Sequence, residues 1–217
     1  MSYVKMKNRK VIICSSAICC ENWLRMYDQL SKNKQPFHMV FCGHIKPEFW
    51  EKIESKKWNI TYVEVDEKTS PAKCAEIAFR VGYTIKDAYY IVQSADDAVF
   101  HKSYLDNQVK VYEKICRDKK IPLMIGPRCK PVDSSEYVEG AGKGEWLLNY
   151  PKLRNLLSLV NTFTSLEVSK QLGSIDNRFH GLYWDLDRQF RMYGIGGETY
   201  LMTNDECKPT FEDRRNK

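Results

Sequence analysis

Short apolar segments alternate along the chain with longer segments whose apolar residues recur every three or four positions. The short segments are rich in Val, Ile, Tyr and Phe, which favour strands; we expect strands at 10–16, 37–42, 58–65, 88–93 and 121–125. The helical spacing predicts helices over 21–32, 47–56, 70–81 and 102–119. This order predicts an α/β fold with a mostly parallel central sheet flanked by helices.

The regular alternation ends after residue 125. The segment 126–150 is predicted to be a long loop, and its run Gly140-Ala-Gly-Lys-Gly144 is not a phosphate-binding P-loop because no Ser or Thr follows the lysine. The remaining expected elements are a strand at 157–163, a helix at 166–172 closed by Gly173, and a strand at 198–203. We therefore expect one domain, with a ligand-binding part at 10–125, a smaller second part at 126–203 and a charged tail at 204–217.

Composition and charge exclude some classes of protein. The 217 residues are 43% hydrophobic with a net charge of +6, and the basic residues are spread along the chain. Since a nucleic-acid binder usually shows a denser basic stripe, the charge instead suits an anionic small ligand or an acidic membrane surface. No apolar run approaches the roughly 18 residues needed to span a bilayer, and the start of the chain does not resemble a signal peptide. We expect a cytoplasmic protein whose eight cysteines are mostly buried and reduced.

Two adjacent carboxylates are the main candidates for chemistry. Asp96 and Asp97 directly follow the predicted strand at 88–93, so they should lie at the carboxyl edge of the sheet, where α/β folds bind ligands. Neighbouring carboxylates repel each other unless a cation compensates, and Mg²⁺ or Mn²⁺ is commonly held by one or two carboxylates plus substrate phosphates. Much later, Asp185 and Asp187 form a second acidic cluster, of which one member can act as a general base.

Ordinary structural interpretations compete with these. A pair of aspartates after a strand often forms only a solvated turn, and acidic residues suit the first turn of a helix because they interact well with its dipole. The other candidate residues likewise fit either a ligand site or a cap, a core position or a solvated surface; they are Ser15, Ser16, Lys73, His180 and Trp184.

Four segments in chain order resemble those of one enzyme family. Residues 94–105, Ser-Ala-Asp-Asp-Ala-Val-Phe-His-Lys-Ser-Tyr-Leu, are similar to a strand ending in an Asp-x-Asp or Asp-Asp-Asp motif followed by a helix. Residues 70–78 resemble the helix that precedes that strand. Residues 172–181 resemble a "Gly-Gly-Phe-Asp-Glu-Arg-Phe" segment, and 184–191 a "Glu-Asp-x-Asp-Leu-x-x-Arg" helix start. The chain thus resembles the nucleotide-sugar-dependent glycosyltransferases of the GT-A fold, particularly the inverting family 2 group.

The resemblance implies a GT-A (Rossmann-like) fold with a smaller C-terminal acceptor-side portion. It implies transfer of a sugar, with inversion, from a nucleotide diphosphate-sugar to a hydroxyl group of a glycan or another acceptor. In the favoured register Ala95 occupies the first motif position, which gives Asp97 the contact to Mn²⁺ or Mg²⁺ and places Asp96 beside the ribose or diphosphate. In the other register Ala98 replaces the usual metal ligand.

The resemblance also distributes the remaining roles. Asp185 becomes the catalytic base, because Trp184 stands where the family has Glu. The residues assigned to the donor besides the Asp pair are Ser15, Ser16 and Lys73, and those assigned to the sugar or acceptor are Trp184 and His180. The turn Cys42-Gly43-His44 lacks the acidic residue that often reads a uracil ring, so the donor base stays open.

Two other functions fit parts of the sequence. A binding module of the same fold, without metal or catalysis, fits the alanines that flank Asp96 and Asp97. A sugar-phosphate nucleotidyltransferase fits less well, because the segment Ser15–Cys20 lacks the Gly-rich, basic signature of those enzymes.

Overall fold

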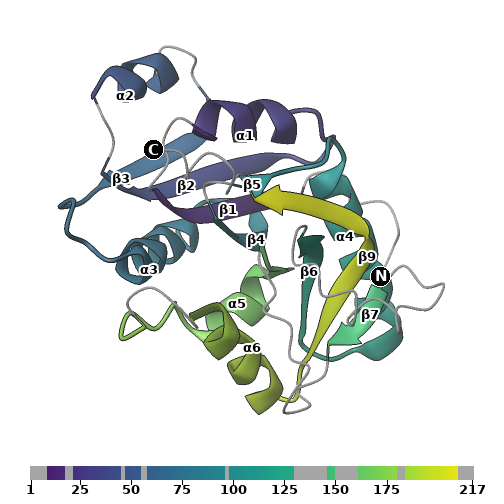
Figure 1. Ribbon diagram of the computed structural model, residues 1–217. Coiled ribbons are helices and arrows are strands. Elements are labelled where there is room, and N and C mark those ends of the chain that lie inside the picture. The colour runs from purple at the N-terminus through teal and green to yellow at the C-terminus, as the bar shows by residue number, and fades with distance from the viewer. Residues whose placement is uncertain are drawn as a thin grey trace.

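The computed structural model describes residues 9–17, 22–44, 47–54, 58–95, 98–129, 146–149, 161–179 and 184–209. The strands are β1 (Lys10–Ala17), β2 (Phe37–Gly43), β3 (Ile60–Glu64), β4 (Ala88–Ala95), β5 (Ala98–Val99), β6 (Leu123–Cys129), β7 (Trp146–Asn149), β8 (Phe163–Ser165) and β9 (Glu198–Pro209). The helices are α1 (Trp23–Leu30), α2 (Pro47–Glu54), α3 (Pro71–Gly82), α4 (Tyr104–Lys119), α5 (Leu166–Leu172) and α6 (Trp184–Gly194) (Figure 1).

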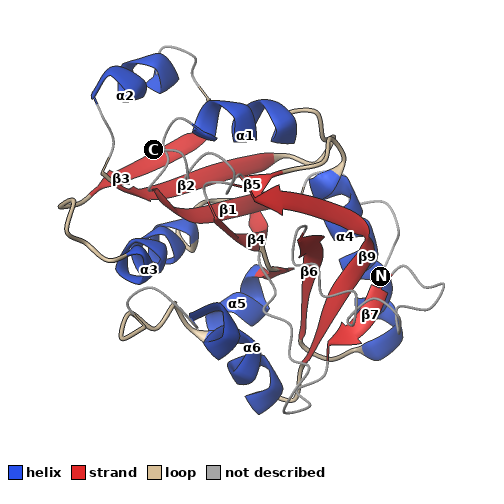
Figure 2. Ribbon diagram, in the orientation of Figure 1, coloured by secondary structure: helices blue, strands red, loops and turns tan. Residues whose placement is uncertain are grey.

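The described strands form one sheet in the order β3-β2-β1-β4-β8-β6-β9-β5, and β7 pairs with β9 (Figure 2). The neighbours β3, β2, β1 and β4 are all parallel, and so are β6 and β9. The short strand β8 is antiparallel to both β4 and β6. The predicted α/β fold with a mostly parallel sheet is confirmed.

Helices cover both faces of this sheet. Successive side chains of a strand point to opposite faces, so Val11 and Ile13 pack with α1 and α4, whereas Ile12 and Cys14 pack with α3. Farther along the sheet, α5 and α6 close over Met124 through Leu172 and Met192. Because both faces are buried, the central strands are apolar without interruption, which is why they could be read from the sequence.

Helices α3 and α5 begin and end at residues suited to those positions. The Ser70 side chain accepts a hydrogen bond from the Lys73 N–H at 3.3 Å, and Pro71 occupies the first turn of α3. Ser165 caps α5 in the same way through the Val168 N–H at 3.2 Å. Gly173 follows α5 with a φ of 79°, a left-handed conformation that glycine adopts without strain. These caps fix where α3 and α5 start.

The structure corrects three details of the second half. Part of the expected loop 126–150 is strand, because β6 continues to Cys129 and β7 occupies Trp146–Asn149. The predicted strand at 157–163 is placed too early: β8 begins at Phe163, while 157–160 lie outside the described residues. Residues 204–209, expected in a charged tail, continue β9, whose backbone pairs with β6, β7 and β5. Pairing on the backbone does not require apolar side chains, so the polar residues 204–209 concealed the end of β9, whereas the apolar segment β7 is too short to mark a strand by itself.

Two further expectations concern the cysteines and the membrane. Cys14, Cys42 and Cys74 are buried and Cys116 is half-buried, and none of these four forms a disulfide. Within the described ranges, no helix is both long and apolar enough to cross a bilayer.

Candidate functional site

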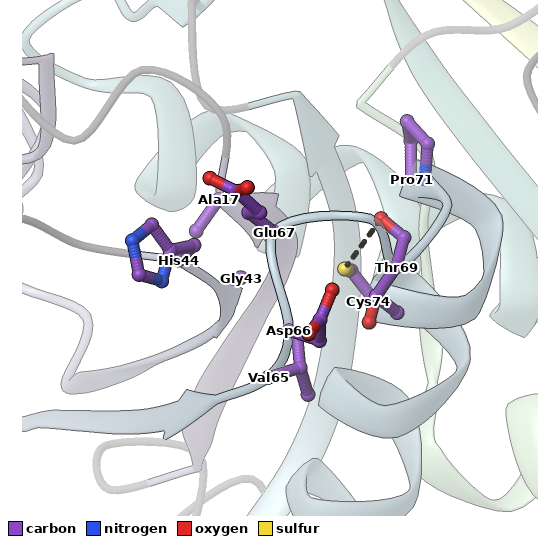
Figure 3. Close-up of a pocket in the computed structure, with 9 residues that line it drawn as sticks. All are labelled: Ala17, Gly43, His44, Val65, Asp66, Glu67, Thr69, Pro71 and Cys74. Carbon is purple, nitrogen blue, oxygen red and sulfur yellow. Dashed lines mark hydrogen bonds between the residues drawn. The ribbon is translucent and has the colours of Figure 1, made fainter.

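A pocket of about 190 Å³ opens at the carboxyl edge of the sheet, where β1, β2 and β3 end and α3 begins. The pocket is lined by the ends of β1 and β2, the residues that follow β2 and β3, and the first turn of α3: Ala17, Gly43, His44, Val65, Asp66, Glu67, Thr69, Pro71 and Cys74. Figure 3 shows the His44 ring on one side of the pocket, and Thr69 and Cys74 on the other. An open α/β sheet is expected to hold its ligand in a pocket at this edge.

The floor of the pocket depends on a close approach between two strand ends. Ala17 and Gly43 are paired partners in the parallel β1–β2 ladder. A Cβ atom at position 43 would lie 2.2 Å from the Ala17 carbonyl oxygen and 2.7 Å from the Ala17 Cβ. Real Cβ atoms do not approach other atoms so closely, so only glycine lets the strands end side by side here.

Two acidic residues that follow β3, Asp66 and Glu67, line the pocket. The Asp66 Oδ1 atom accepts the Lys68 N–H at 2.8 Å and the Asp66 carbonyl accepts the Thr69 N–H at 2.9 Å, which makes the turn into α3. On the rim, His44 Nδ1 lies 3.6 Å from Glu64 Oε1, and both side chains are more than half exposed. The pocket therefore presents carboxylate acceptors to a ligand that carries N–H or O–H donors.

Two thiols meet beneath the pocket. Cys42 is buried at the end of β2, and Cys74 is buried in the first turn of α3 with its Sγ 3.8 Å from the Thr69 carbonyl oxygen. A hydrogen bond from the Cys42 thiol lowers the pKa of Cys74, and the same bond together with burial raises the pKa of Cys42. Of the two, Cys74 lines the pocket and is therefore the thiol that a bound ligand would cover.

Ser16 lies directly beside the strand end that leads into the Asp pair. In the β1–β4 ladder Ser15 pairs with Ser94, and Ser16 pairs with Ala95, the residue before Asp96. Both hydroxyl side chains are buried, and the Ser15 hydroxyl donates to the Ser16 carbonyl at 2.9 Å. The end of β1 is thus adjacent both to the pocket, which Ala17 lines, and to Ala95, the last described residue of β4.

Lys73, predicted to contact the donor, forms an ion pair with Glu76 on its own helix. Its Nζ lies 2.6 Å from Glu76 Oε2 one turn farther along α3, and it is not among the residues that line the pocket. Glu76 is only 8% exposed and also accepts Asn177 Nδ2 at 2.8 Å, while Arg80 Nη1 lies 3.5 Å away. The Lys73 ammonium lowers the pKa of Glu76. Lys73 therefore belongs to a network that joins α3 to the segment before α6, and its predicted contact with the donor stays a prediction.

The helix that carries Asp185 is anchored by two arginines. The fully buried Arg188 donates to the Gly173 carbonyl at 2.9 Å and to Ser169 Oγ at 3.0 Å, and burial lowers its pKa. Arg191 donates to the Leu172 carbonyl at 2.7 Å. These three hydrogen bonds tie α6 to the end of α5 and so hold the first turn of α6 in place.

The two acidic residues of this first turn differ in their surroundings. Asp187 forms an ion pair with Arg191, with 2.6 Å between Oδ2 and Nη2. Asp185 is half-buried, and its Oδ1 accepts the Leu186 N–H at 2.9 Å. Asp187 is thus paired with the arginine four positions later, and the role of Asp185 as the base stays a prediction.

Several predicted site residues lie outside the described residues. These are Asp96, Asp97 and His180, together with the side chain of Trp184. Their predicted roles stay predictions.

Sequence reasoning missed two parts of this region. Asp66 could have been found, because it follows a predicted strand by one residue and so falls at the carboxyl edge by the same rule that selected Asp96. Asn161 had no local signal: it contacts the end of β4 although 66 positions separate it from Ala95.

Comparison with known proteins places the chain by its fold. No protein-family model matches the sequence, and no curated protein matches it. Among solved structures, residues 1–349 of S. aureus TarS, a GT-A-type glycosyltransferase, superpose with a TM-score of 0.61 at 12% identity, covering 94% of this chain and 60% of that one. The chain has a GT-A-like fold.

The other TarS structures agree. The same TarS fragment in complex with UDP gives a TM-score of 0.60 at 12% identity, covering 95% of this chain and 62% of that chain. A longer TarS structure gives 0.61 and 12% identity, covering 94% and 36%. The chain thus spans about 60% of the length of the TarS fragment that it resembles. The GT-A-like fold predicted from the sequence motifs is confirmed.

Proposed function

We propose that the chain is a glycosyltransferase that moves a sugar from a nucleotide diphosphate-sugar to a hydroxyl acceptor. The observation that carries the proposal is the acidic pocket at the ends of β1, β2 and β3, on a GT-A-like sheet and beside the strand that leads to Asp96 and Asp97. One sheet edge thus gathers a place for a nucleoside and a pair of carboxylates for its diphosphate.

The pocket supports binding of the nucleoside part of the donor. Nucleobases present N–H donors and riboses present O–H donors, and both pair with carboxylate acceptors such as Asp66 and Glu67. The TarS fragment was solved with UDP, which makes UDP the first ligand to test. Asp66 also offers the acidic group that the turn after β2 lacks.

The proposed chemistry divides between two carboxylate sites. Asp185 would accept the proton of the acceptor hydroxyl as that oxygen attacks the anomeric carbon, and direct displacement would invert the configuration there. Asp96 and Asp97 would hold Mn²⁺ or Mg²⁺ with the donor phosphates; when bound, the cation stabilises negative charge on the departing diphosphate.

The donor set fits such an ion. Hard divalent cations take oxygen ligands and are commonly held by one or two carboxylates with substrate phosphates completing the shell. No group of three or more His, Cys, Asp or Glu residues that could hold a metal occurs in the part of the chain that the structure describes. The proposal assigns the protein ligands of the ion to Asp96 and Asp97, which lie outside the described residues.

Calorimetric titration tests the nucleotide pocket. We expect UDP to bind the wild-type chain, and Asp66→Asn to weaken this binding by roughly 10-fold or more, the value of a hydrogen bond to a charged group. The variant keeps Oδ1, which caps the turn, so it should fold normally. The matched control is Glu48→Gln on the outer helix α2, which should bind as the wild type does. Equal affinity for UDP in Asp66→Asn and the wild type would show that the nucleoside does not bind at Asp66 in this pocket.

Donor turnover tests the catalytic assignment. Release of UDP from UDP-sugars should require a divalent cation and should fall by at least 100-fold in Asp97→Ala and in Asp185→Asn, within the range for loss of a general base. Asp118→Asn, an exposed position on α4, is the control. Wild-type rates in both site variants would refute these roles. UDP binding that ignores metal, without turnover of any sugar nucleotide, would instead indicate a binding module.

A further inference from the structure

Asn161 combines two unusual properties. Its backbone has a φ of 55°, in the left-handed region that few non-glycine residues adopt, and its side chain is only 2% exposed. Asparagine tolerates this conformation better than most residues. The position therefore requires both a left-handed backbone and a short polar side chain in the interior.

The side-chain oxygen of Asn161 holds the end of β4. Its Oδ1 accepts the Ala95 N–H at 3.1 Å and the Ser94 hydroxyl at 3.0 Å. The residue is itself fixed, because its backbone carbonyl accepts the Tyr104 hydroxyl at 3.0 Å. The oxygen is thus a rigidly placed acceptor aimed at the last residues before Asp96.

The side chain takes over where backbone pairing stops. On this side of β4 the ladder with β8 covers 90–92, and the Gln93 N–H donates to the Thr162 carbonyl at 2.8 Å. The next N–H on the same side, that of Ala95, reaches Asn161 Oδ1 instead of a backbone carbonyl. Asn161 therefore extends β4 by two residues beyond its backbone partner strand.

The chain is also fixed on the far side of the Asp pair. Ala98 pairs with Pro209 and Val99 with Lys208 in the β5–β9 ladder. The Phe100 N–H donates to Gln29 Oε1 at 2.8 Å. Asp96 and Asp97 are thus joined by single peptide bonds to residues that other parts of the protein hold in place.

We propose that Asn161 is a positioning residue for the Asp96–Asp97 pair, acting through its hydrogen bonds to Ser94 and Ala95. This rests on the proposed function, because the pair needs a fixed position only if it binds a metal and a diphosphate. Groups that orient metal ligands from outside the coordination shell commonly change metal affinity by 10- to 100-fold when they are removed.

The decisive variant is Asn161→Gly, which permits the left-handed backbone and removes only the acceptor. We expect the Mn²⁺ concentration for half-maximal UDP affinity to rise about 10-fold or more, with UDP affinity in the absence of metal unchanged. The matched control is Lys120→Gly, which introduces glycine at another left-handed position, with a φ of 56°, whose side chain is exposed. It should leave the Mn²⁺ dependence as in the wild type. The same Mn²⁺ dependence in Asn161→Gly and the wild type would overturn the proposal.

Hydrogen exchange separates this proposal from the proposed function and needs neither ligand nor turnover. In the unmutated protein the Ala95 amide should be protected to about the same extent as that of Gln93, and in Asn161→Gly it should exchange at least 10-fold faster. Rapid exchange of Ala95 in the wild type, or no change in the variant, would show that Asn161 does not hold the strand end. If exchange behaves as expected but neither UDP nor Mn²⁺ binds the wild type, then the proposed function fails, and the positioning role of Asn161 fails with it.

Discussion

Replacing Gly43 by alanine should damage both stability and the pocket. The added Cβ would lie 2.2 Å from the Ala17 carbonyl oxygen, about 1 Å inside ordinary contact, and the obstructing atom is backbone rather than a flexible side chain. The strand ends would have to separate at a paired position of the β1–β2 ladder. Overpacking of this kind typically costs 1–3 kcal/mol, and we expect about 3 kcal/mol here because backbone must move.

Urea denaturation measures this cost, and for a chain of this size about 3 kcal/mol should lower Tm by roughly 6–12 °C. Gly194→Ala is the matched control, because no atom lies within 4 Å of its added Cβ and Gly194 lies in α6. Alanine there should be neutral or stabilise the protein by up to about 1 kcal/mol. A Gly43→Ala variant within about 0.5 kcal/mol of the wild type would refute the claim that the strand ends require glycine.

Three further predictions use other parts of the fold. Because Lys73 lowers the pKa of Glu76, the ionised carboxylate stabilises the fold above its unfolded pKa near 4.5, and this stability is lost as the pH falls through the lowered pKa. In Glu76→Gln the free energy of unfolding should therefore fall less steeply at acidic pH than in the wild type. An unchanged slope would contradict this. UDP should slow alkylation of Cys74, measured by mass spectrometry, because the thiol lines the pocket; equal rates with and without UDP would place the nucleotide elsewhere. In chemical denaturation, Phe163→Ala should cost about 3–5 kcal/mol because the ring is fully buried, whereas Phe190→Ala, 55% exposed, should cost under about 0.5 kcal/mol; similar losses would contradict the assigned packing.

The first half of the fold could be predicted because its physics is local. Its central strands are apolar on both faces, and α3 begins with a serine cap and a proline, so a few neighbouring residues are enough to predict each element. The second half could not be predicted as well, because the end of β9 pairs in the sheet despite its polar composition and β7 is only 4 residues long.

The candidate site shows the same division. The sequence could place Ser16 at the end of a strand, whereas its position beside Ala95 follows from the β1–β4 pairing, which the sequence did not predict. The donor role of Lys73 stays a prediction; its place on α3 could be read from the sequence, but its ion pair with Glu76 depends on distances within the fold. Asn161 was missed because a side chain that replaces a strand partner leaves no periodic trace in the sequence.

The pairing of β5 with the end of β9 has a consequence for the order in which the molecule forms. Ala98 and Val99 find their partners only at Pro209 and Lys208, so closing this contact requires nearly the whole chain to be collapsed first. The parallel unit of β1 to β4 can assemble from the first hundred or so residues, whereas the flank of the Asp pair is completed last. During synthesis the pocket at the ends of β1, β2 and β3 would thus form before the β5–β9 contact that follows the Asp pair. In pulsed hydrogen exchange during refolding, the Ile13 amide should become protected before that of Val99, and simultaneous protection would argue against this sequence of events.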